Sequence, residues 1–70
     1  MDEETLNISL RKFLKNVGIN SQRLIEEKVR SAVQSSQISS SQKIKISAKI
    51  ISKDIALDEQ IDGELEIKFD

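Results

Sequence analysis

The residue types in this chain leave few groups that could do chemistry near neutral pH. Histidine, cysteine, tyrosine and tryptophan are absent from all 70 residues, and these side chains often serve as general bases, nucleophiles or metal ligands. The remaining carboxylates, lysines and hydroxyls would need strongly shifted pKa values, and a chain this short offers little burial to shift them. We therefore expect no enzyme activity, no catalytic residue and no cofactor.

One short segment resembles the start of a calcium-binding loop. Asp58, Gln60 and Asp62 alternate along the chain and Gly63 follows, as the first ligands and the turn glycine of such a loop do. The position that should supply a bidentate carboxylate is Phe69, and the segment alternates like a strand. We interpret it as a hairpin turn and expect no metal site.

The segment from residue 13 to residue 33 resembles a helix-turn-helix, which would place a second helix in a DNA groove. Gly18 would form the turn, but Glu26 and Glu27 would repel phosphates, and the chain has no tyrosine or tryptophan to stack on bases. Nucleic-acid binding is therefore the alternative function. Its candidate contacts are Arg11, Lys12, Lys15, Ser21, Gln22, Arg23 and Arg30.

The elements that must position these residues begin with two amphipathic helices. A first apolar stripe at helical spacing consists of Leu6, Leu10, Phe13, Leu14 and Val17. A second consists of Ile25, Val29, Ala32 and Val33. Asp2 suits the start of the first helix, Gly18 suits its left-handed end, and Asn20 or Ser21 suits the start of the second. The sequence predicts helices over about 3–17 and 21–35.

The C-terminal half changes to the alternation of strands. A Ser-rich segment over 36–42 is expected to be a mobile loop, followed by strands over about 43–51, 54–60 and 64–69. A two-residue turn at 52–53 keeps the apolar faces matched. A two-residue turn at Asp62 and Gly63 would mix them, so a three-residue loop over 61–63 is preferred.

These elements predict one α+β domain over residues 1–70, with an ααβββ order. Two antiparallel helices would lie on one face of a three-stranded antiparallel meander and share one interior with it. The other sheet face would be exposed to water. In that arrangement both helix stripes pack against the sheet. We therefore expect the corner at Gly18 to have a structural role and not to recognise DNA.

Charge and leftover apolar residues bear on partners. Residues 1–53 carry 10 basic and 5 acidic side chains, whereas residues 54–70 carry 1 and 7, which fits either neighbouring segments of one fold or a basic surface for an anionic partner. Four apolar residues fall outside the predicted core and mark a possible partner surface: Ile8, Leu24, Ile38 and Ile51. Single exposed apolar residues are also common. We expect a domain that interacts with another protein or associates with itself. Homodimers would meet at the edge of the last strand or around Ile8.

The absence of a long apolar segment and the acidic start predict a cytoplasmic protein without a membrane span or signal peptide. The motifs R-K-F-L-K at 11–15, V-G-I-N-S-Q-R at 17–23 and D-G-E-L-E-I at 62–67 resemble those of a family of short, uncharacterised bacterial proteins. The resemblance covers nearly the whole chain and implies no activity or site. Such relatives tend to have an acidic residue where this chain has Leu24, so capping of the second helix would fall to Asn20 or Ser21 alone.

Overall fold

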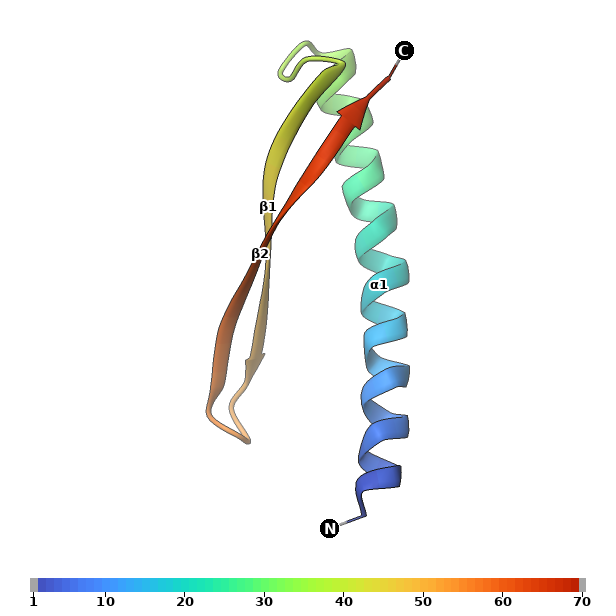
Figure 1. Cartoon of the computed structure of the whole chain (residues 1–70), viewed down its shortest axis with the longest axis vertical. Coiled ribbons are helices and arrows are strands. Elements are labelled where there is room, and N and C mark those ends of the chain that lie inside the picture. Colours follow the sequence, from blue (N-terminus) through green and yellow to red (C-terminus); the bar gives the residue numbers. More distant parts are fainter. Residues whose placement is uncertain (1, 70) are drawn as a thin grey trace. The chain divides into compact units, whose positions relative to one another are not determined.

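The computed structural model describes residues 2–69 and contains one helix and two strands. Helix α1 spans Glu3–Gln34, strand β1 spans Ser41–Ser52 and strand β2 spans Leu57–Lys68 (Figure 1). The chain divides into two compact units between Ser35 and Ser36, the first holding α1 and the second the hairpin. The fold is α+β, but the predicted ααβββ order is wrong, because there is one helix in place of two and two strands in place of three.

Helix α1 begins at a well-formed cap. The side chain of Asp2 accepts hydrogen bonds from the backbone N–H of Thr5 (3.1 Å) and from its hydroxyl (2.6 Å), which satisfies a backbone donor that the first turn leaves unpaired. Glu3 and Glu4 lie in the first turn, where the helix dipole favours negative charge. The predicted start of the helix is therefore confirmed.

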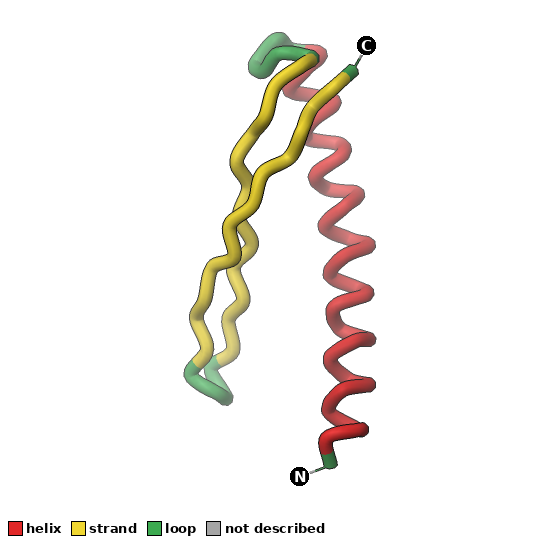
Figure 2. Tube along the Cα trace, viewed as in Figure 1, coloured by secondary structure: helices red, strands yellow, loops and turns green. Residues whose placement is uncertain are grey.

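The predicted corner at Gly18 is absent, because α1 continues through it (Figure 2). A glycine inside a helix costs only about 1 kcal/mol relative to alanine, and the chain contains no proline to stop the helix. Asn20 does not cap a new helix. Its side-chain amide instead donates to the carbonyl of Asn16 one turn earlier, at 2.8 Å. The two predicted helices are thus the two halves of α1.

Serines end α1 and lead into the hairpin. Ser35 is the C-cap residue, and Ser36 takes a left-handed backbone with φ of 62°, the conformation that commonly follows a helix. Farther on, the backbone N–H of Ser39 donates to the side chain of Gln42 (2.7 Å), and the Ser39 hydroxyl accepts from the N–H of Ser41 (3.1 Å). The predicted loop over 36–42 is therefore too long, because its last two residues belong to β1.

The two strands pair antiparallel without a break, from Ser41 opposite Lys68 to Ser52 opposite Leu57. A four-residue turn over 53–56 joins them (Figure 2). The predicted turn at 52–53 is therefore wrong. So is the predicted loop over 61–63, because β2 runs straight through Gly63, which lies opposite Ile46. Most of the predicted second and third strands belongs to the one longer strand β2, whereas residues 54–56 of the predicted second strand lie in the turn.

The longer ladder is favoured because both of its faces match. On one face Ile44 lies opposite Leu65 and Ala48 opposite Ile61; on the other, Lys43 lies opposite Glu66 and Lys45 opposite Glu64. Apolar pairs and opposite-charge pairs across strands each stabilise a sheet. The predicted meander also matched apolar residues, because it paired Ile55 and Leu57 with the first strand. That pairing required a break at 61–63, where β2 is in fact continuous.

Little of the described chain is buried. Ile67 is the one hydrophobic side chain among residues 2–69 that is below a tenth exposed. Many large apolar side chains of α1 and of the hairpin remain about half exposed or more. The question for function is therefore what these apolar surfaces contact.

Candidate interaction surfaces

One row of residues on α1 has the spacing of a coiled-coil seam. The row advances by four, three, four, three and four residues, and we call it the α1 seam: Leu6, Leu10, Phe13, Val17, Asn20 and Leu24. At about 100° per residue these six positions fall within about 80° of the helix circumference. Five are apolar and only Asn20 is polar.

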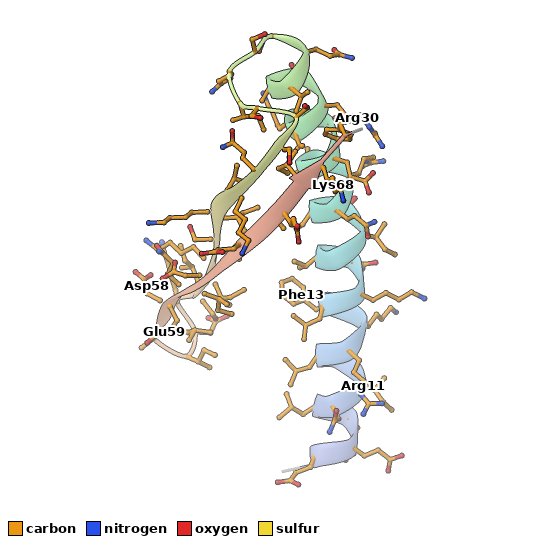
Figure 3. The ribbon with its side chains drawn as sticks, turned by 45° about the horizontal axis from the view of Figure 1, so that its top comes forward. Arg11, Phe13, Arg30, Asp58, Glu59 and Lys68 are labelled. Carbon is orange, nitrogen blue, oxygen red and sulfur yellow. The ribbon has the colours of Figure 1, made fainter. Side chains whose placement is uncertain are left out.

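The seam is open to solvent along most of its length. Leu6 is 44% exposed, Phe13 55% and Leu24 60%, whereas Val17 is half-buried. Figure 3 shows Phe13 and Arg11 on different sides of α1, which follows from their difference of about 160° around the axis. No charged residue interrupts the seam, so it is an apolar surface able to receive another apolar surface.

Gly18 lies on α1 outside the seam, about 120° around the helix from Leu6. Its backbone φ is not in the left-handed region, so no turn requires a glycine there. A Cβ placed on it would meet no atom within 4 Å outside its own helix backbone and immediate chain neighbours, so no close packing requires one either. Helix α1 therefore accepts the cost of this glycine without a structural reason in the described residues.

The four residues predicted as a partner surface do not share one face. Ile8 and Leu24 are both about 60% exposed but differ by about 160° around α1. Ile51 lies opposite Asp58 on the charged side of the hairpin and is 62% exposed, and Ile38 is half-buried in the loop before β1. Of the four, only Leu24 belongs to the α1 seam.

The residues predicted to contact nucleic acid do not lie on a helix-turn-helix, which the prediction required. A helix-turn-helix needs a turn between two helices, and α1 has none. Arg23 donates to the side chain of Asn20 (3.3 Å), and Gln22 donates to Glu26 (3.0 Å). Lys12, Lys15, Arg23 and Arg30 lie within about 80° of one another on the side away from the seam, but Glu26 falls inside the same sector. Arg11, Ser21 and Gln22 lie outside it.

The hairpin has one apolar face and one charged face. Apart from Lys68 at the end of β2, each strand supplies one sign of charge to the charged face: β1 supplies Lys43, Lys45 and Lys49, and β2 supplies Asp58, Asp62, Glu64 and Glu66. Lys49 Nζ lies 3.5 Å from Asp58 Oδ1, and both side chains are more than half exposed. Asp58 and Glu59 lie toward the turn (Figure 3). These two charged rows lie on one face of the hairpin, and the alternation of lysines and acids in the sequence was their signal.

The segment that resembles a calcium loop is extended backbone inside β2. Gln60 donates from its side-chain amide to Asp62 Oδ1 at 2.7 Å, and among the described residues no three His, Cys, Asp or Glu side chains converge as metal ligands. A shallow depression lies beside Gly63, where a side chain is missing opposite Ile46. Its lining consists of Lys45, Ile46, Ser47, Asp62, Gly63 and Glu64, in which Lys45 and Glu64 are cross-strand neighbours.

The described part of the chain holds no helix with both the length and the apolar character of a membrane span. Comparison with curated proteins and with solved structures finds no match for this chain. The model of the family of unknown function DUF6494 matches residues 1–68, which confirms the predicted relation to an uncharacterised family. The chain therefore belongs to the DUF6494 family.

Proposed function

We propose that this protein is a small non-catalytic interaction domain that associates with a second copy of itself through the α1 seam. The observation that carries the proposal is a charge-free row of large apolar side chains, 44–60% exposed at four of its positions, on one helix. The absence of histidine, cysteine, tyrosine and tryptophan supports a binding role over a catalytic one.

The energetic reason for a partner is that helices gain most of their stability from packing an apolar face. Covering a side chain such as leucine or phenylalanine contributes about 1.5–3 kcal/mol when its burial becomes complete. The seam offers five such positions. A second helix of the same sequence supplies the same spacing and the same lack of charge, so each seam residue can pack against its counterpart.

Asn20 points to a parallel arrangement of the two helices. A polar residue at one core position of a coiled coil sets the alignment of the helices at some cost in stability. In a parallel pair the two Asn20 side chains face each other and can exchange amide hydrogen bonds. In an antiparallel pair centred on the seam, Asn20 would face Leu10, and its amide would lose that partner.

Sedimentation over a concentration series tests the proposal with a matched pair of variants. Phe13→Glu places a charge in the seam and should lower the average mass at concentrations where the natural protein is associated, because pairing through α1 is lost. Ile8→Glu places the same charge on the far side of α1, where it should leave the association within about twofold. Equal loss of association in both variants, or the mass of one chain throughout for the natural protein, would refute the seam as the interface.

An engineered cysteine tests the parallel arrangement, because the natural chain has none. Under oxidising conditions, Asn20→Cys should form a disulfide-linked pair, since two copies of the same position lie close only in a parallel arrangement. Ile19→Cys lies away from the seam and serves as the control. Cross-linking of Ile19→Cys but not of Asn20→Cys would show that the helices do not meet as proposed.

A further inference from the structure

The hairpin carries a second surface, independent of α1. Among residues 2–69, the sheet consists of β1 and β2 only, and each strand is 12 residues long. Each strand therefore uses one side of its backbone for the ladder and presents the other at an outer edge. Unpaired N–H and C=O groups along such an edge can pair with a further strand.

The register identifies which backbone groups point outward. The N–H of Phe69 donates to the carbonyl of Ser40 at 2.8 Å, and these residues continue the register in which Ser41 lies opposite Lys68. Hydrogen-bonded and non-hydrogen-bonded pairs alternate in an antiparallel ladder. The outward N–H groups on β1 are therefore those of Lys43, Lys45, Ser47, Lys49 and Ile51. On β2 they are those of Asp58, Gln60, Asp62, Glu64 and Glu66.

The side chains at these outward positions control which edges can meet. Two β1 edges would bring lysines against lysines, and two β2 edges would bring carboxylates against carboxylates. Like charges directly opposite each other destabilise a strand pair. A β1 edge against a β2 edge instead repeats the opposite-charge pairs already present in the hairpin, such as Lys45 opposite Glu64.

We propose that a second copy adds its β1 to the outer edge of β2, antiparallel and in the register of the hairpin itself. In this register Ile44 of the added strand again faces Leu65 on the apolar face, and Lys43 faces Glu66 on the charged face. The residues that would bond across the new contact, such as Lys43 and Glu66, form non-hydrogen-bonded pairs within each hairpin. Their backbone N–H and C=O groups therefore point outward and are available for the new bonds. Because the contact joins two different edges, it repeats from copy to copy and is not limited to a dimer.

Amide hydrogen exchange over a protein concentration series tests this contact residue by residue. As concentration rises, the outward amides of both β1 and β2 should exchange at least tenfold more slowly, so that their rates approach those of the inward amides. Protection of the β2 edge alone would indicate contact between two β2 edges and overturn the proposal. Association with both edges still exchanging fast would also overturn it, while leaving pairing through the α1 seam intact.

A proline at Gln60 provides the matched variant. Gln60→Pro removes an outward N–H and leaves the inward bonds of β2, as proline does on an edge strand. It should abolish the slow exchange of the outward amides, with inward amides such as that of Ile61 still protected. Gln60→Thr also loses the side-chain bond to Asp62 but keeps the N–H, so it should behave as the natural protein does. Unchanged edge protection in Gln60→Pro would reject the contact.

Discussion

Asp2 illustrates how a single residue sets the boundary of an element. The hydrogen bond from the Thr5 hydroxyl, followed by the one from the Thr5 backbone N–H, lowers the pKa of the Asp2 carboxyl below its usual value. These bonds favour the ionised form. The cap should therefore operate above the pKa of an unfolded aspartate and weaken as the pH falls through the lower pKa of the folded chain.

This titration gives a prediction for the first turn of α1. Lowering the pH from about 5 to about 2 should speed the amide exchange of Thr5, after correction for the intrinsic pH dependence, because protonated Asp2 caps poorly. Asp2→Asn should keep the cap and lose the pH dependence, and Asp2→Ala should exchange fast at every pH. Exchange at Thr5 in the natural protein that shows no step over this range would contradict the cap.

Gly18 shows the limit of reading single residues. Glycine after a helical stripe is typical of a helix end, and that reading produced the predicted corner. The same residue is tolerated inside a helix at modest cost, and nothing in the local sequence distinguishes the two outcomes.

At the scale of elements, the hairpin is specified by two faces at once. Alternating apolar residues align Ile44 with Leu65, and alternating charges align Lys45 with Glu64. A slip by one residue would reverse every side chain and set lysines and carboxylates against apolar residues. The charges on the exposed face thus contribute to register as well as to solubility.

Charge reversal across this ladder tests their contribution to stability. Lys45→Glu should destabilise the hairpin by about 0.5–1 kcal/mol, since it places like charges at directly opposite positions. Lys45→Glu combined with Glu64→Lys should restore most of the loss by reforming an opposite-charge pair. Denaturation of each variant at low salt measures both effects. A double variant no more stable than the single one would show that the cross-strand charges do not interact.

At the scale of the whole molecule, the two proposed contacts use different parts of the chain and predict separable assembly. The α1 seam forms a closed pair, whereas the hairpin edges form an open series. Together they would give assemblies larger than a dimer. Phe13→Glu should leave only the edge contact, Gln60→Pro should leave only the pair, and the two substitutions together should give the mass of one chain.

Light scattering on the natural protein, the two single variants and the double variant, all at one concentration, measures the outcome. A double variant that still assembles would reveal an interface outside both surfaces. Raising the salt should weaken the edge contact, whose specificity comes from exposed charges, more than the apolar pair. A pair through the α1 seam that weakens more with salt than the edge contact does would contradict a role for the charges in the edge contact.

The sequence by itself determined local properties, which are the helical spacing on both sides of Gly18, the cap at Asp2 and the strand alternation from Lys43 onward, and it showed that histidine, cysteine, tyrosine and tryptophan are absent. The spacing, the cap and the alternation each depend on neighbours a few residues apart, where periodicity and side-chain chemistry are informative. Its motifs also indicated the uncharacterised family. The sequence correctly excluded a two-residue turn at Asp62 and Gly63 but placed another loop there.

Only the tertiary structure decided whether elements continue or break. One helix or two around Gly18, and one strand or two around Gly63, differ by small local free energies, so the result depends on pairing along the entire helix or ladder. It also separated Ile8 from Leu24 and brought Leu24 into line with Leu6. The angle between two residues on a helix has meaning only when the helix between them is unbroken, and that continuity could not be read from either half alone.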